Sequence, residues 1–286
     1  MTAVQPALAG MPKRLFSCTP SRLAAFDCPR RYRFTYLDRP APPRGRAWAH
    51  NTVGAVVHLA LARWWSLPPE QRTPSAGRHL VERNWQHDGF RDPEQSAQWR
   101  EIAASWVEQY LRDVDPYDEP WGVERTVATA TEGLAVSGRV DRIDRRERDG
   151  RTELVVVDYK TGRRPLDTDD ARSSLALALY TLAVRRTLRQ PCVRVELHHL
   201  PTGTVAAAEH TDETLARHVA RAEATAQDIV AAKDTLDSGA DADEVFPAIP
   251  SPSCSWCDFR PVCAEGRAAS NDLEPWAGLA ETTGQG

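Results

Sequence analysis

The spacing of apolar residues divides the chain into a helical first part, a strand-rich middle and a helical last part. Between residues 48 and 65, apolar side chains recur at the three- and four-residue spacing of an amphipathic helix. The same spacing occurs over 96–111, and an Ala- and Leu-rich stretch predicts a third long helix over 170–188. A further amphipathic helix is predicted over 211–236, because a threonine that can cap it precedes its first apolar residues.

Strand patterns fill the middle of the chain. Apolar positions alternate over 122–130 and 134–144, and a β-branched run follows at 154–157. The charged segment before that run contains Asp149-Gly150, a dipeptide that favours a tight hairpin turn. Strands joined by such short connections predict an antiparallel meander. Two further strands are predicted at 193–200 and 204–208.

The third predicted strand ends in Asp158, Tyr159 and Lys160. Alternate side chains of a strand share a face, so Asp158 and Lys160 point to one side and Tyr159 points to the other. A carboxylate at this position can hold a hard divalent cation, and the lysine can orient a water molecule or offset charge on a reacting phosphate. The alternative is an ordinary surface ion pair at the end of a strand.

Composition describes an ordinary globular protein. The chain has 286 residues, of which 41% are hydrophobic and 27% charged, and its net charge of −4 restricts any nucleic-acid surface to a local patch. No apolar run is long enough to cross a membrane, and residues 1–11 lack a secretion-signal pattern, so a cytoplasmic protein is expected. In a reducing compartment, six cysteines are more often metal ligands or buried thiols than disulfides.

A first candidate site combines His58, Asp141, Asp158 and Lys160. A meander can bring the end of its second strand beside the end of its third, so the two carboxylates can share a cation, with His58 supplied by the preceding helix. Oxygen ligands with one imidazole suit magnesium or manganese. The alternative is that Asp141 pairs with a neighbouring arginine and that His58 is a buried structural residue.

A second candidate site is the cysteine motif near the end of the chain. Cys254, Cys257 and Cys263 have the spacing C-x2-C-x5-C, which favours metal ligation in a cytosolic protein. A fourth thiolate has to come from Cys18, Cys28 or Cys192. Zinc and an iron–sulfur cluster both accept four thiolates, and the spacing does not choose between them.

Five short motifs follow one another along the chain. They are Phe16-Ser17 with Cys28-Pro29-Arg30-Arg31-Tyr32, Gly54 to His58, Gly138 to Asp144, Val157 to Gly162, and the final cysteine motif. This order resembles the PD-(D/E)XK nuclease superfamily, in the RecB-like exonuclease branch whose members carry an iron–sulfur cluster. The resemblance covers roughly residues 15–266.

The resemblance implies an α/β fold of the restriction-endonuclease type. Its core is a central mixed sheet with an antiparallel meander, flanked by helices, and a cysteine-ligated cluster joins the N- and C-terminal segments. The implied boundaries are a flexible tail at 1–14, one nuclease domain at 15–266 and a flexible tail at 267–286. The domain divides into a mainly helical part at 15–120, the nuclease core at 121–210, and a helix with the cysteine cluster at 211–266.

The resemblance also implies roles for individual residues. His58, Asp141, Asp158 and the backbone carbonyl of Tyr159 correspond to ligands of magnesium or manganese, and Lys160 corresponds to the catalytic lysine. One N-terminal and three C-terminal cysteines correspond to the ligands of a [4Fe–4S] cluster, with zinc as the alternative metal. They are Cys28, Cys254, Cys257 and Cys263.

Tyr180 corresponds to a site tyrosine on the helix after the lysine. The family usually carries a glutamine four residues before this tyrosine, where the present chain has Ala176.

The implied function is a metal-dependent DNA nuclease, an exonuclease on single-stranded ends that acts in repair, recombination or processing. The chain has no Walker-type motif, so any unwinding requires a separate helicase. The alternatives are a nuclease-fold module that binds DNA without cleaving it and a structural zinc protein.

Three clusters of arginine residues are the candidate DNA contacts. One surrounds Cys28, a second lies near the predicted hairpin, and a third follows Lys160 directly. Trp256 and Phe259, within the cysteine motif, can either stack on bases or pack over the cluster. The arginines are Arg30, Arg31, Arg33, Arg142, Arg145, Arg146, Arg148, Arg163 and Arg164.

Overall fold

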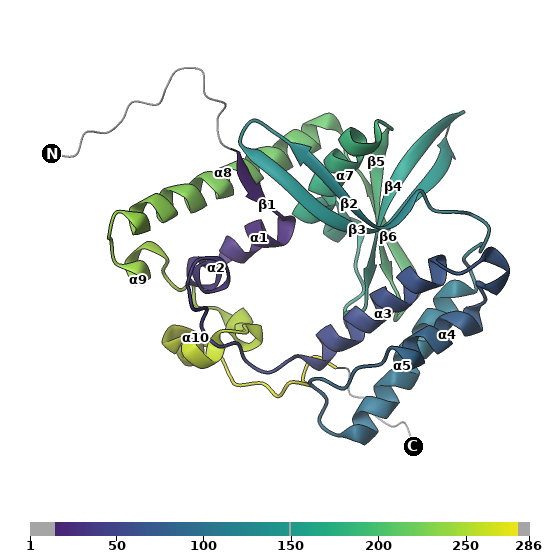
Figure 1. The fold of residues 1–286 in the computed structure, drawn as a ribbon, viewed down its shortest axis with the longest axis horizontal. Helices are drawn as coiled ribbons and strands as arrows, with labels where there is room; N and C mark the ends of the chain where they lie inside the picture. Colours follow the sequence, from purple (N-terminus) through teal and green to yellow (C-terminus); the bar gives the residue numbers. More distant parts are fainter. Residues whose placement is uncertain (1–14, 149, 280–286) are drawn as a thin grey trace.

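A computed structural model describes residues 15–148 and 150–279 of the chain (Figure 1). Its strands are β1 (Phe16–Cys18), β2 (Gly122–Ala130), β3 (Leu134–Arg148), β4 (Arg151–Lys160), β5 (Cys192–His199) and β6 (Thr204–Glu209). Its α-helices are α1 (Pro20–Ala24), α2 (Pro29–Tyr36), α3 (Ala49–Trp65), α4 (Pro74–Arg83), α5 (Pro93–Leu111), α6 (Thr168–Ser173), α7 (Leu175–Leu188), α8 (Asp212–Asp237), α9 (Ala242–Val245) and α10 (Ala264–Ala269). No helix in the described ranges is both long and apolar enough to cross a membrane.

The strands form one mixed sheet. Strand β3 pairs with β2 and β4 in antiparallel orientation, so the predicted meander is confirmed. Strand β5 then lies parallel to β4, and β6 returns antiparallel to β5. The short strand β1, which the sequence did not reveal, pairs in parallel with the first residues of β3. The result is an α/β architecture with a central mixed sheet flanked by helices, as the family resemblance implies.

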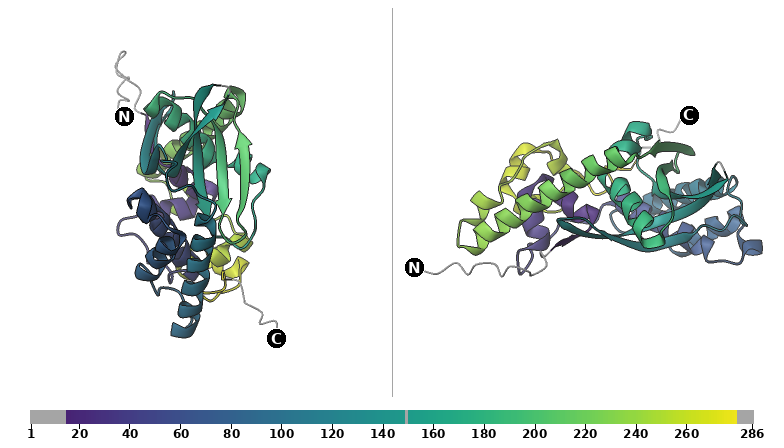
Figure 2. Two further views of the ribbon diagram at one scale, coloured as in Figure 1. Left: turned by 90° about the vertical axis from the view of Figure 1, so that its right-hand side faces the viewer. Right: turned by 90° about the horizontal axis from the view of Figure 1, so that it is seen from above.

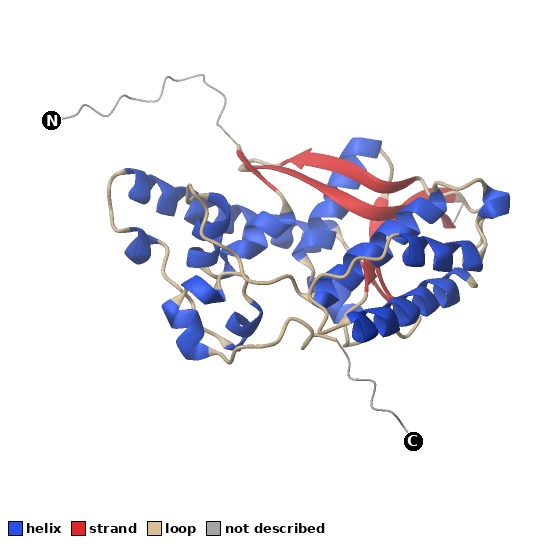
Figure 3. Ribbon diagram, turned by 60° about the horizontal axis from the view of Figure 1, so that its bottom comes forward, coloured by secondary structure: helices blue, strands red, loops and turns tan. Residues whose placement is uncertain are grey.

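Helices cover both faces of this sheet because β4 is apolar on both sides (Figures 2 and 3). Val155, Val157 and Tyr159 pack with the cluster formed by α3, α4 and α5. Leu154 and Val156 face the opposite way and pack with α6 and α7. Burial of both faces, as in parallel sheets, explains why this strand lacks polar alternation until Asp158.

A third hydrophobic cluster joins the two ends of the chain. Cys18 and Tyr32, from the N-terminal segment, pack with Ile229 of α8 and with Phe246. The Tyr32 and Phe246 rings are stacked, with centroids 6.5 Å apart. In Figure 1, α2 accordingly lies near α9 and α10, although more than two hundred residues separate them along the chain.

The predicted long helix over 170–188 is divided into α6 and α7. At Ser174 the backbone is extended, with ψ of 109°, and the side chain of Ser174 accepts a hydrogen bond from the Leu177 N–H as the N-cap of α7. Apolar, helix-favouring residues on both sides hide this break in the sequence. The break changes the direction of the chain between Lys160 and Tyr180.

The C-terminal segment also differs from the prediction of a flexible tail from residue 267 onward. Within the described residues, the Ala49 N–H donates to the Pro275 carbonyl at 3.0 Å, and Leu279 is only 5% exposed. Leu279 and Trp276 belong to the cluster around α3, because they provide the apolar surface that covers the start of that helix. The predicted tail at 1–14 and the last residues, 280–286, lie outside the described residues.

Leu279→Ala tests this packing. We expect the substitution to lower the free energy of unfolding by about 2–5 kcal/mol, because it removes buried methyl groups and leaves a cavity beside α3. Chemical denaturation measures the change, and Val230→Ala, at an exposed position of α8, is the matched control. Equal stability of the Leu279 variant and the wild type would show that this segment does not contribute to the fold.

Candidate active site and cysteine pocket

Strand register brings three carboxylates into one row across β2, β3 and β4. The pairs Val123–Arg142 and Arg125–Val140 flank the position at which Glu124 lies opposite Asp141. On the other side of β3, the ladder to β4 ends at the Arg142–Val157 pair, so Asp158 follows directly opposite Asp141. Side chains in such a row share one face of a sheet, and the row therefore concentrates negative charge at one place.

Asp141 is the centre of this row. Its Oδ2 accepts a hydrogen bond from the Tyr159 N–H at 2.9 Å and lies 3.2 Å from His58 Nδ1. Burial opposes ionisation of Asp141, but His58 and the Tyr159 N–H outweigh it and lower the pKa of the carboxyl group. Asp141 is therefore held as a carboxylate.

His58 connects helix α3 to the row. Its Nε2 lies 3.0 Å from the Tyr159 carbonyl oxygen, and its Nδ1 faces Asp141. Burial lowers the pKa of the His58 imidazole, but the Asp141 and Asp158 carboxylates have a larger combined effect and raise it. His58 therefore contacts two other predicted ligand groups, the Asp141 carboxylate and the Tyr159 carbonyl.

Asp158 and Lys160 lie on the same side of β4, and the Lys160 ammonium group forms an ion pair with Asp158 Oδ2. Burial raises the pKa of the Asp158 carboxyl group; Lys160 opposes this shift and Asp141 adds to it. Three possible metal ligands lie close to one another: His58, Glu124 and Asp141 have ligand atoms within 4.8 Å of one another. Asp158 is not among these three.

Glu124 is the site residue that sequence reasoning missed. It has a left-handed backbone conformation, with φ of 48°, and forms an ion pair with Arg139 at 2.7 Å. Burial raises the pKa of the Glu124 carboxyl group. A single glutamate in a strand gives no signal by itself. Only the pairing register of β2 with β3 places it beside Asp141.

Tyr180 of α7 lies over the same strands. A Cβ atom at Gly138 would come within 2.4 Å of Tyr180 Cε1, so glycine is required for this close approach. Tyr180, His58, Glu124 and Asp141 line one pocket of about 640 Å³. The pocket is large enough for a ligand and opens beside the row of carboxylates.

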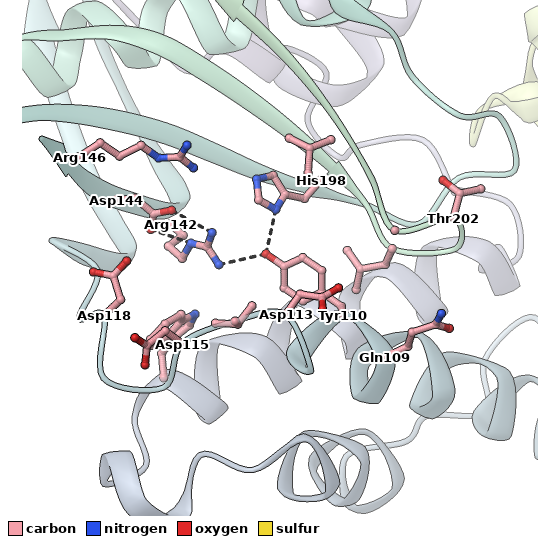
Figure 4. Close-up of a pocket in the computed structure, with 15 residues that line it drawn as sticks. Gln109, Tyr110, Asp113, Asp115, Asp118, Arg142, Asp144, Arg146, His198 and Thr202 are labelled. Atoms are coloured by element: carbon pink, nitrogen blue, oxygen red, sulfur yellow. Dashed lines mark hydrogen bonds and ion pairs between the residues drawn. The ribbon is translucent and has the colours of Figure 1, made fainter. Parts of the chain in front are cut away.

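The opposite face of the strand end holds a buried polar network (Figure 4). Arg142 donates hydrogen bonds to the hydroxyl oxygens of Tyr110 and Tyr159, both at 3.0 Å, and forms an ion pair with Asp144 at 2.8 Å. The Tyr110 hydroxyl also lies 2.8 Å from His198 Nδ1. This network fixes the Tyr159 side chain, while the backbone of the same residue contacts His58 and Asp141.

The four cysteines assigned by resemblance line one small pocket together with Phe34 and Phe259. Backbone N–H groups point at three of the sulfur atoms: Ile249 at Cys28, Ser251 at Cys254 and Gly266 at Cys263, at 3.4–3.5 Å. All six cysteines are free thiols. The four in the pocket are Cys28, Cys254, Cys257 and Cys263.

Cys18 and Cys192 lie elsewhere, each inside a hydrophobic cluster. Burial raises the pKa of the Cys18 thiol to about 11 and that of Cys192 to about 12. Both are therefore plain buried thiols, in contrast to the four cysteines that share a pocket.

Several predicted DNA contacts have structural partners instead. Arg30 and Arg33 are buried and bind Glu265 and Asp243, both at 2.8 Å, so they join the ends of the chain. Arg142 is only 5% exposed. The arginines of the β3–β4 hairpin and those after Lys160 are exposed and remain candidates for DNA contact.

The fold and site together define an α/β protein whose mixed sheet carries clustered carboxylates beside a histidine and a lysine. The chain belongs to the PD-(D/E)XK nuclease superfamily, since the sequence model of that family matches residues 17–264. Members of this superfamily are nucleases, and membership indicates a hydrolase of phosphodiester bonds. No curated protein matches the chain.

Two solved structures are similar over most of their length. One is a candidate exonuclease from Eubacterium rectale, at 12% sequence identity and a TM-score of 0.47, with 82% of this chain and 87% of that chain covered. The other is the protein SSO0001, at 13% identity and a TM-score of 0.33, with 88% and 87% covered.

Arg142→Ala tests the buried network. We expect a loss of about 3–5 kcal/mol in the free energy of unfolding, because the substitution removes the buried partner of Asp144 and of the Tyr159 hydroxyl. Chemical denaturation gives this value. Arg172→Ala removes an exposed ion pair with Asp169 and serves as the control, with an expected loss below about 1 kcal/mol. A loss at Arg142 no larger than at Arg172 would contradict the structural role.

Proposed function

We propose that the chain is a metal-dependent deoxyribonuclease of the RecB-like branch. The observation that carries the proposal is the convergence of His58, Asp141 and the Tyr159 carbonyl, with Asp158 and Lys160 adjacent. The proposed substrate is DNA with single-stranded ends. The protein would degrade it as an exonuclease, during repair or recombination in the cytoplasm. The proposed nuclease domain is residues 15–266.

The donor set fits a hard divalent cation. Carboxylate oxygens, one imidazole and one backbone carbonyl suit magnesium or manganese. Asp141 and Asp158 are adjacent carboxylates, and neighbouring carboxylates repel each other unless a cation or a proton lies between them. The residues proposed to hold the metal are His58, Asp141, Asp158 and the Tyr159 carbonyl, with Glu124 as an additional ligand close to His58 and Asp141.

When bound, such a cation polarises a phosphoryl oxygen and lowers the pKa of a water molecule. The protein supplies the other elements of catalysis. Lys160 carries the ammonium group nearest the carboxylates, and its proposed role is to orient the attacking water or to stabilise charge on the phosphate. Tyr180 borders the pocket and is proposed to position the substrate.

A [4Fe–4S] cluster is proposed for the cysteine pocket, with zinc as the alternative. Four thiols in one pocket match the ligand number of either metal centre, and backbone N–H groups beside the sulfurs stabilise thiolates. The proposed role is structural. A cluster on Cys28 and Cys263 closes a loop of more than two hundred residues and restricts the unfolded chain.

A nuclease-fold module that binds DNA without turnover is the second candidate. The observation that favours it is Ala176, at the position where the family usually has glutamine. In either case the partner is DNA, and a separate helicase would provide unwinding. Cleavage of end-labelled single-stranded DNA by anaerobically purified protein, with manganese, magnesium or chelator, distinguishes the two candidates.

Lys160→Ala is expected to reduce metal-dependent cleavage by roughly 10²–10⁴-fold, because the ammonium group beside the carboxylates is lost. The rate of product formation from end-labelled DNA is the measurement. Lys233→Ala removes an exposed lysine of α8 and should cleave at the wild-type rate. Cleavage by the Lys160 variant at the wild-type rate would refute the role of this lysine. DNA binding without cleavage by both the wild-type protein and the Lys160 variant would support the second candidate.

Cys257→Ala is expected to lose iron and thermal stability, because one of four thiolates in the pocket is removed. Iron content and the visible absorbance of anaerobically purified protein are the measurements. Cys192→Ala is the control, since that thiol is buried in another hydrophobic cluster. Retention of the chromophore by the Cys257 variant would contradict the proposed ligand set, and zinc in the wild-type protein would favour the alternative metal.

A further inference from the structure

A second pocket, of about 630 Å³, lies next to the end of β4 and combines aromatic with basic residues. Trp99 and Trp106 of α5 form one wall, and Trp256 from the cysteine motif contributes another. Arg163 and Arg164, which directly follow the Lys160-Thr161-Gly162 sequence, border the same space. Trp99 and Trp106 also belong to the hydrophobic cluster around α3, whereas Trp256 is the exposed aromatic residue of this pocket.

Trp256 is held on one side and open on the other. Its ring lies 5.1 Å from the ring of Trp48 and 5.4 Å from that of His50, measured between centroids. The residue nevertheless remains 41% exposed. Phe259, the other aromatic residue of the cysteine motif, is buried against Phe34. Trp256 is therefore a pre-positioned flat surface, in contrast to Phe259.

The two arginines have side chains available for an anion. Arg163 is exposed and has no ion-pair partner among the residues that the structure describes. Arg164 pairs with Asp170 at 2.7 Å, but 68% of its side chain remains exposed. Guanidinium groups in this position complement phosphate oxygens.

Helix α3 links this pocket to the candidate active site. His50 and Val53 line the aromatic pocket, whereas Gly54 and His58 line the pocket beside the carboxylates. His50 and His58 are eight residues apart on one helix, which corresponds to about 12 Å. A few nucleotides of an extended strand cover that distance, so one strand can occupy both pockets.

We propose that this pocket is a nucleobase-stacking subsite for single-stranded DNA, in which Trp256 stacks on an unpaired base a few nucleotides from the scissile phosphate. Arg163 and Arg164 bind the phosphates between the two pockets. The inference rests on the proposed nuclease function and specifies its substrate. Stacking is tolerant of sequence because every base has a flat face, but paired bases in a duplex do not expose that face. The subsite therefore selects single strands.

The test measures binding of fluorescein-labelled oligothymidine in the Lys160→Ala background, where the DNA stays intact. Adding Trp256→Ala should weaken binding roughly 5- to 100-fold, and Trp256→Phe should restore most of the affinity. Tyr117→Ala, at an aromatic residue that is 68% exposed and outside the pocket, is the control. Iron content is measured in each variant, because Trp256 lies between two of the pocket cysteines.

Abasic scanning locates the contact. Oligonucleotides with one abasic residue, moved stepwise from the 5′ to the 3′ end, should show one position at which binding to the Trp256-containing protein weakens. The same position should have no effect with Trp256→Ala, because base and ring form one interaction. Arg163→Glu leaves the cysteine motif intact and should weaken binding and reduce its salt dependence by roughly one phosphate contact.

The outcomes separate this inference from the proposed function. Metal-dependent cleavage by wild-type protein, together with unchanged affinity in both the Trp256→Ala and Arg163→Glu variants, would overturn the subsite and leave the nuclease standing. Equal weakening by every abasic position would also overturn it. Failure of the wild-type protein to bind or cleave any DNA would refute the proposed function itself.

Discussion

The antiparallel register of β2, β3 and β4 is the constraint on which the rest of the structure depends. A shift of one residue along β3 would turn Asp141 to the other face and bury a carboxylate among the apolar side chains there. The register is secured from both sides of the sheet. Val155 and Val157 pack toward α3 and α5, while Val156 packs toward α7. The carboxylate row is thus a consequence of how the core is packed.

Tyr159 connects the two faces of this arrangement. Its backbone N–H and carbonyl contact Asp141 and His58, and its side chain is fixed by Arg142 on the opposite face. A buried arginine is costly unless it is paired and hydrogen-bonded, and here two tyrosine hydroxyls and Asp144 are the partners of Arg142. The network around Arg142 supports the end of β4 from one face, while the Asp141 and Asp158 carboxylates lie close together on the other face.

The sequence predicted the elements whose signals are local. Alternating apolar positions and short connections predicted the meander, and strand alternation placed Asp158 and Lys160 on one side. Glu124 was missed because its place depends on register, which a single strand does not encode. Arg30 and Arg33 were assigned to DNA because their partners, Glu265 and Asp243, lie more than two hundred residues away. The break at Ser174 was hidden between two helix-favouring stretches.

The meeting of the two chain ends has a consequence for the order of folding during synthesis. Tyr32 and Arg30 are synthesised more than two hundred residues before their respective partners, Phe246 and Glu265, so these contacts form late. Before α8 is made, β1 can already pair with β3, and the first helices can pack on β3 and α7, but the apolar side chains of α8 and Phe246 are still missing from this cluster. All strands of the central sheet are therefore synthesised before α8 and Phe246, which complete the packing around the N-terminal helices.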